Sequence, residues 1–113
     1  MNLEINSEQD SWLENSLKYL NFGRIAKQEK LRIESSQRSF YRITSKDYNS
    51  IILMVVPHGI DESVRSFVDK AEIFKKYSVN VPNVYSYDLK LGLILVEDFG
   101  DNIYQYNLQE DPD

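Results

Sequence analysis

Two short segments carry the groups that could do chemistry. Residues 97–101 form an acidic turn with one glycine, directly after the apolar run at residues 93–96. Where a buried strand ends in such a turn, its backbone amides and carbonyls can hydrogen-bond the edge of a flat, neutral ring. Residues 35–38 bring backbone amides, the Ser36 hydroxyl and the Arg38 guanidinium together, which suits phosphate oxygens. These segments are the candidate binding site.

Residue types exclude most other catalytic chemistries. The chain has no cysteine, which excludes disulfides and thiolate metal sites. Its single histidine, His58, precedes Asp61 at a spacing that fits a loop and a helix-start acid better than a catalytic loop. No Ser/His/Asp arrangement, metal-ligand cluster or phosphate-binding glycine loop occurs. We therefore predict no catalytic and no metal-ligating residue.

Composition indicates one ordinary globular domain. The 113 residues are 42% hydrophobic and 27% charged, values typical of soluble proteins. The net charge of −5 comes without a basic cluster, which argues against a nucleic-acid partner. No apolar stretch is long enough to span a membrane or resembles a signal peptide, so no membrane partner and a cytoplasmic location are expected.

The first expected element is a helix with Ser7 as its N-cap. Ser7 and Asp10 resemble a capping box, and leucines then recur at helical spacing at positions 13, 17 and 20. Gly23 is expected to close this helix at the C′ position.

Five strands and a second helix are expected to follow. The strands are at residues 30–34, 38–44, 50–56, 84–87 and 93–97, and the helix is at residues 61–77. Short loops join the first three strands, so they pair antiparallel, and the amphipathic second helix packs across them. The predicted fold is α+β: a five-stranded antiparallel sheet with one packed helix and a short N-terminal helix.

Four motifs in this order resemble the N-terminal lobe of a kinase. They are residues 36–42 (SQRSFYR), residues 52–57 (ILMVVP), Phe67-Val68-Asp69 followed by Val81-Pro82, and residues 92–101 (GLILVEDFGD). They are most similar to the aminoglycoside phosphotransferase-like family, and within it to bacterial cell-wall amino-sugar kinases that phosphorylate N-acetylmuramate or N-acetylglucosamine. A valine replaces the acid of the second motif.

The resemblance implies a kinase-like N-terminal lobe at residues 1–101 and an acidic tail at residues 102–113 that begins a missing C-terminal lobe. The family's catalytic aspartate, magnesium ligands and sugar-binding helices belong to that second lobe. The implied cofactor is ATP, with magnesium supplied through the C-terminal lobe. The nucleotide-binding residues that the resemblance implies are Ser36, Arg38, Val96, Glu97, Phe99 and Asp101.

The resemblance also assigns roles within this set. Val96 would be the gatekeeper, the Glu97 carbonyl would accept from adenine N6, and the Phe99 amide would donate to adenine N1. Ser36 and Arg38 would cover the triphosphate.

Plainer interpretations of both segments remain open. Residues 93–101 could be a strand that ends in an acidic turn, and residues 35–38 could be a polar hairpin. Asp98-Phe99-Gly100 matches the magnesium-binding tripeptide of protein kinases, but no HRDxxxxN loop lies upstream, so a hinge is favoured. Most kinases also have a lysine where the third strand here has Met54; the resembling sugar kinases lack it too.

The expected function is therefore the nucleotide-binding lobe of an ATP-dependent amino-sugar or aminoglycoside-type phosphotransferase, not competent alone. Its partners would be a nucleotide and either a C-terminal lobe from a separate chain or a second copy. The alternative is a non-catalytic protein-interaction module, or the remnant of a split or decayed kinase gene.

Overall fold

Two helices and five strands make up the part of the chain that the computed structural model describes, residues 5–31, 38–56, 61–77, 81–98 and 100. In chain order they are α1 (Ser7–Tyr19), β1 (Ile25–Lys30), β2 (Ser39–Ser45), β3 (Ser50–Val55), α2 (Asp61–Lys76), β4 (Val84–Asp88) and β5 (Leu93–Glu97). The predicted α+β fold, with a five-stranded antiparallel sheet and two helices, is confirmed.

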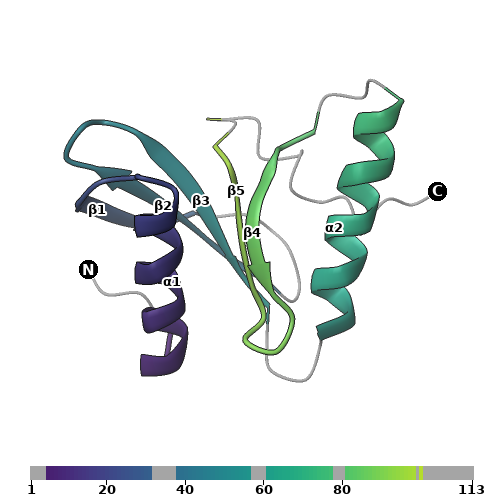
Figure 1. Ribbon diagram of the computed structural model, residues 1–113, viewed down its shortest axis with the longest axis horizontal. Coiled ribbons are helices and arrows are strands. Elements are labelled where there is room, and N and C mark those ends of the chain that lie inside the picture. The colour runs from purple at the N-terminus through teal and green to yellow at the C-terminus, as the bar shows by residue number, and fades with distance from the viewer. Residues whose placement is uncertain (1–4, 32–37, 57–60, 78–80, 99, 101–113) are drawn as a thin grey trace.

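The strands form one sheet in the order β1-β2-β3-β5-β4 (Figure 1). Its central strand is β3, which pairs antiparallel with β5 so that Ile52 lies opposite Val96. Arg42 of β2 lies opposite Ile52 on the other side, so Arg42, Ile52 and Val96 occupy neighbouring positions across the sheet. β4 forms one edge and β1 the other.

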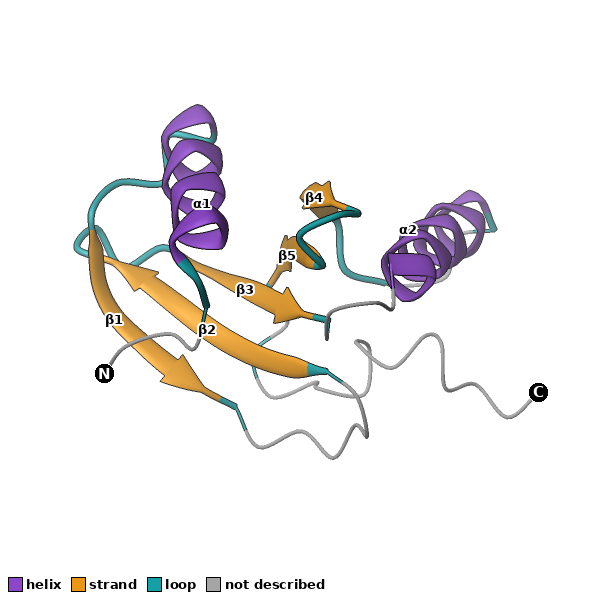
Figure 2. Ribbon diagram, turned by 90° about the horizontal axis from the view of Figure 1, so that it is seen from below, coloured by secondary structure: helices purple, strands orange, loops and turns teal. Residues whose placement is uncertain are grey.

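The two helices cover opposite faces of the sheet (Figure 2). Successive side chains of a strand point to opposite faces, and in β3 Ile51 and Leu53 pack with α1 while Ile52 and Met54 pack with α2. The apolar run over residues 51–54 is thus buried on both sides, as its continuous pattern predicts. The N-terminal helix is therefore a second packed helix, and both faces of the sheet are covered.

α1 is capped by different residues from those predicted. Its N-cap is Asn6, whose side-chain oxygen accepts from the Gln9 amide at 2.7 Å, while the Gln9 side chain accepts from the Asn6 amide at 2.9 Å. This is the capping-box chemistry expected for Ser7 and Asp10, one residue earlier, so that assignment was wrong.

The C-terminal cap of α1 also differs from the prediction. Asn21, with a φ of 56°, takes the left-handed conformation directly after the helix, whereas Gly23, with a φ of 97°, lies two residues further along the chain. The Phe22 amide donates to Leu17 and the Asn21 amide to Lys18, each at 3.0 Å, which is a Schellman motif closed by the packing of Phe22 near Leu17. Neither helix of the described residues is long and apolar enough to cross a membrane.

The other element boundaries agree with the prediction within one residue, except at the first strand. β1 begins at Ile25, five residues before the predicted start at Lys30. Its ladder with β2 continues past its end, because the Leu31 amide donates to the Phe40 carbonyl at 2.8 Å. The rest of the predicted strand, residues 32–34, lies outside the described residues.

Candidate functional site

The candidate site lies where β5 ends beside the start of β3. The β3–β5 ladder pairs Ile51 with Glu97, and its next step brings Asp98 beside Ser50. Arg42 of β2 faces the same side of the sheet as Phe40, which packs with α2. Register and alternation therefore direct the Arg42 and Asp98 side chains toward one another.

Arg42 and Asp98 form a bidentate ion pair that holds the turn after β5. The Arg42 Nε donates to Asp98 Oδ2 at 2.8 Å, and the Arg42 Nη2 donates to Asp98 Oδ1 at 3.2 Å. The same Nη2 donates to the Gly100 carbonyl at 2.8 Å, and the Gly100 amide donates to Asp98 Oδ1 at 2.8 Å. We call this set of contacts the Arg42–Asp98 clamp; it fixes both ends of residues 98–100 against β2.

The clamp is largely shielded from water. The Asp98 side chain is 8% exposed and the Arg42 side chain 21% exposed. Burial raises the pKa of the Asp98 carboxyl, but hydrogen bonds from Arg42, Ser50 and the Gly100 amide outweigh burial and hold that pKa below its ordinary value. Asp98 is therefore ionised at neutral pH and held by its partners.

We expect the clamp to make the chain less stable in acid. Because the folded-state pKa of Asp98 is lowered, its contribution to stability is present above the ordinary aspartate value of about 4 and is lost as pH falls through the folded-state value. Urea denaturation midpoints measured from pH 7 downward should fall less steeply for Asp98→Asn than for the native chain. Parallel curves for the two proteins would contradict this prediction.

The predicted adenine-contacting residues are partly described. Val96 is fully buried among the side chains that pack with α2. The Glu97 amide donates to the Asn83 carbonyl at 2.8 Å, and Glu97 Oε1 accepts from the Asn83 amide at 3.1 Å, which ties the end of β5 to the residue before β4. Phe99 and Asp101 lie outside the described residues.

Of the predicted phosphate-contacting residues, the structure describes Arg38. Arg38 directly precedes β2 and is half-buried, whereas Ser36 lies outside the described residues. Arg38 and Arg42 are four residues apart, roughly 13 Å at about 3.3 Å per strand residue. The described structure therefore holds Arg38 and the clamp apart along one strand, rather than in one cluster.

The clamp is the feature that sequence reasoning missed. In the sequence, Arg42 was noted only as part of a motif match, and Asp98 only as part of a tripeptide that resembles a magnesium site. One signal was present in the sequence: a charged residue inside a strand between Tyr41 and Ile43 needs a buried partner. Choosing that partner 56 residues away requires the strand register.

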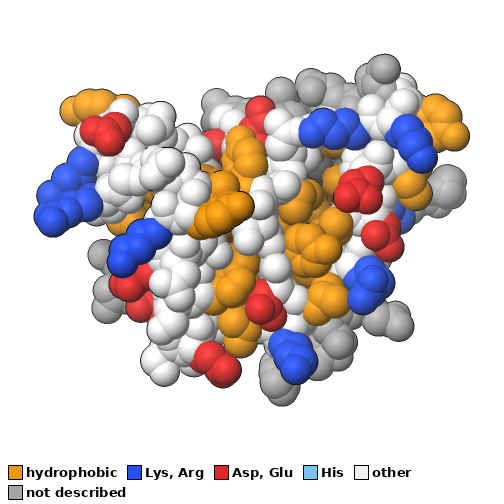
Figure 3. All heavy atoms as spheres, in the orientation of Figure 1, with side chains coloured by type: hydrophobic (Ala, Val, Ile, Leu, Met, Phe, Trp, Pro, Cys, Tyr) orange, Lys and Arg blue, Asp and Glu red, His pale blue; other side chains and the backbone are white. Residues whose placement is uncertain are grey.

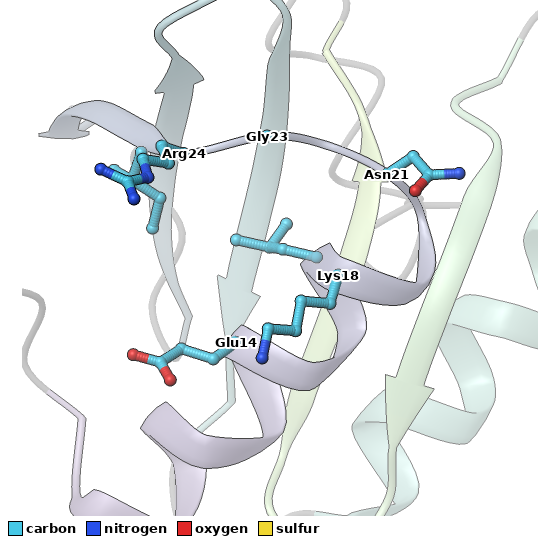
Figure 4. Close-up of a pocket in the computed structure, with 7 residues that line it drawn as sticks. Glu14, Lys18, Asn21, Gly23 and Arg24 are labelled. Atoms are coloured by element: carbon cyan, nitrogen blue, oxygen red, sulfur yellow. The ribbon is translucent and has the colours of Figure 1, made fainter.

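A separate hollow of about 660 Å³ lies between the end of α1 and the start of β1 (Figure 4). Glu14, Lys18 and Arg24 stand around it, and all three are exposed. Asn21, at the helix end, points away from Glu14 and Lys18 (Figure 4). These charges do not converge on one point, and within the described residues no three His, Cys, Asp or Glu side chains are placed to hold a metal.

Apolar side chains are exposed around the edge strand β4. Figure 3 shows them gathered between the two helices, over the strand that Figure 1 labels β4. Tyr85 is 44% exposed and Tyr87 47% exposed, and both belong to β4. Ile73 and Tyr77, on and just after α2, are also exposed.

Comparisons with known proteins identify no family for this chain. No protein-family model matches the chain, and a search of curated proteins found no match.

Proposed function

We propose that this chain is the nucleotide-binding half of an ATP-dependent phosphotransferase of the amino-sugar-kinase type, which transfers phosphate only with a C-terminal lobe. The observation that carries the proposal is the Arg42–Asp98 clamp at the end of β5. A turn fixed in this way keeps a constant geometry, which is what recognition of a flat base edge requires.

The element order supports the same proposal. A helix follows three antiparallel strands, and two further strands return to the sheet. β5, which pairs with the central strand β3, leads directly into the clamped turn. This is the arrangement expected for a lobe that grips adenine at the end of its fifth strand.

The distance along β2 between Arg38 and the clamped turn is suited to an elongated ligand. Adenine at the clamped turn and a triphosphate near Arg38 would lie roughly 13 Å apart along the strand at about 3.3 Å per residue. ATP is an elongated molecule with its base and its phosphates at opposite ends, so these two positions suit it.

The magnesium ion of such an enzyme does not fit the described residues. Asp98 is held by Arg42 through both carboxylate oxygens, and the described part of the chain offers no three carboxylate or imidazole groups placed to bind a metal. The proposal therefore assigns magnesium and the base that orients the sugar hydroxyl to the C-terminal lobe.

Amide-resolved NMR with magnesium and a non-hydrolysable ATP analogue tests the proposal. We expect shifts at Glu97, Asp98 and Gly100 and at Arg38, with smaller shifts for the analogue that has inosine in place of adenosine, because inosine lacks the N6 donor. Arg38→Met should weaken binding about tenfold, the effect of one charge-assisted hydrogen bond. Arg24→Met, which removes an exposed arginine beside β1, is the matched control and should leave binding unchanged.

Two outcomes would contradict the proposal. One is a well-dispersed spectrum that does not change with nucleotide. The other is phosphoryl transfer by the purified chain that survives Asp98→Ala, because the chain would then need no second lobe.

The exposed aromatic side chains of β4 favour a second candidate, a protein-interaction module. Among the described strands β4 pairs only with β5. Its other edge could add a strand from another chain, and Tyr85 and Tyr87 would then contribute apolar area. Concentration-dependent dimerisation in sedimentation equilibrium, together with no response to nucleotide, would favour this candidate over the kinase lobe.

A further inference from the structure

A second, smaller hollow lies at the opposite end of α1 from the capping box. It has a volume of about 300 Å³ and lies between the C-terminal end of α1, the turn that leads into β3, and Tyr85 of β4. That volume is near the lower end for small-molecule sites, about 300–1,000 Å³. Asn21 lines both hollows, and its side chain points away from Glu14 and Lys18 (Figure 4).

The walls of this hollow combine apolar, aromatic and amide groups. Phe22 and Ile51 are buried, 7% and 3% exposed, and form its apolar base. The Tyr85 ring, 44% exposed, lines it from β4, and the side chains of Asn21 and Asn49 are on exposed positions at its rim. Among the described residues that line it there is no lysine or arginine, so none of them brings a positive charge that would favour an anion.

Three features favour positive charge in this hollow. It opens at the C-terminal end of α1, where the helix dipole places partial negative charge. Glu97 is close enough to act on Tyr85: burial first, and then the Glu97 carboxylate, raise the pKa of the Tyr85 phenol. The face of a tyrosine ring also attracts cations.

We propose that this hollow between α1 and Tyr85 is a binding site for a small organic cation of the quaternary ammonium type. The cation lies against the Tyr85 ring, with its methyl groups on Phe22 and Ile51 and its charge toward the end of α1 and Glu97. This hollow borders the proposed nucleotide site, because Ser50 lines it and also bonds Asp98. The clamp side chains themselves lie on the α2 side of the sheet, and binding of a cation in the hollow does not require nucleotide to bind.

Choline chloride is the probe, and 3,3-dimethyl-1-butanol is its neutral counterpart of the same shape. In NMR titrations of the intact chain we expect choline to shift the amides of Phe22, Asn49, Ile51 and Tyr85, and the neutral alcohol to shift them much less. Tyr85→Leu should weaken choline binding about five- to tenfold, whereas Tyr85→Phe should retain it, because the ring and not the hydroxyl contacts the cation. Tyr87→Leu is the matched control: it has similar exposure on the same strand but does not line the hollow.

Each alternative result would overturn the proposal. Equal binding of choline and the neutral alcohol would make the hollow an apolar site without charge preference. Equal losses for Tyr85→Leu and Tyr87→Leu would mean that choline binds the strand surface, not the hollow. An absence of shifts at about 100 mM choline, where even a site of about 10 mM would be mostly filled, would mean that no such site exists.

Discussion

Arg42→Met should lower the free energy of unfolding by about 2–3 kcal/mol, because it leaves the Asp98 carboxylate shielded from water without its main partner. Removing one member of a fully buried ion pair costs about 3–5 kcal/mol. The Arg42 side chain is 21% exposed and the Asp98 side chain 8% exposed, so water can partly replace the lost contact and the expected cost is lower. Urea denaturation followed by circular dichroism measures this difference.

A double-mutant cycle separates the clamp from the side chains themselves. In Arg42→Met with Asp98→Asn no unpaired charge remains, so the double variant should be more stable than Arg42→Met alone. The exposed pair Lys27 and Glu29 is the matched control, with 3.8 Å between its charged atoms and side chains 67% and 46% exposed. Lys27→Met should cost less than about 0.5 kcal/mol. Equal costs for Arg42→Met and Lys27→Met would mean that the clamp does not stabilise the fold.

The same variants connect stability to the proposed nucleotide site. If the clamp fixes the turn after β5, Arg42→Met should speed hydrogen exchange at the Gly100 amide, which donates to Asp98 in the native chain. It should also weaken the nucleotide response at Glu97 and Gly100 more than its loss of global stability explains. Exchange that speeds equally at all amides would instead indicate a global effect with no special role for the turn.

The elements that the sequence predicted well are those with a strong local signal. Residues 93–96 form a continuous apolar run between a turn and an acidic segment, and β5 has the predicted bounds, residues 93–97. α2 has an apolar stripe at helical spacing, and its predicted end lies one residue from the observed one. In such segments the local pattern and the tertiary packing favour the same structure.

β1 was misplaced because an edge strand has weak periodicity. Its sequence, IAKQEK, includes four polar or charged residues in six positions, and only its pairing with β2 fixes its extent. Propensity and alternation cannot supply that pairing, because it depends on contacts between distant residues.

The candidate site was predicted as a segment but not as a structure. The end of β5 was identified from its pattern, yet the group that holds it, Arg42, lies on a strand 56 residues earlier. The left-handed cap was assigned to Gly23 by its residue type, whereas Asn21 takes this conformation, which asparagine adopts more readily than most residues, and allows Phe22 to pack near Leu17. In both cases packing between distant elements decided among alternatives that the local sequence allowed.

Gly92→Ala should destabilise the chain by about 3 kcal/mol, the second large effect that we expect. Gly92 has a φ of 70°, which by itself costs an alanine about 1–2 kcal/mol. An added Cβ would also lie 2.6 Å from the Val56 carbonyl oxygen. That oxygen belongs to backbone that cannot move freely, because the Val56 amide donates to the Gly92 carbonyl at 2.7 Å. The clash therefore forces apart the hydrogen bond that joins the β4–β5 turn to the end of β3.

Gly100→Ala is the control that isolates this clash. Gly100 has a similar φ of 65°, but an added Cβ would meet no atom of the described residues within 4 Å. Alanine there should cost only the conformational penalty of about 1–2 kcal/mol. Measured as shifts in urea midpoint, a larger loss at position 92 than at position 100 is the contribution of the close approach between the turn and β3. Equal losses would mean that the turn can move away from Val56 at little cost. The contact between Gly92 and Val56 would then not fix the position of β5 beside β3.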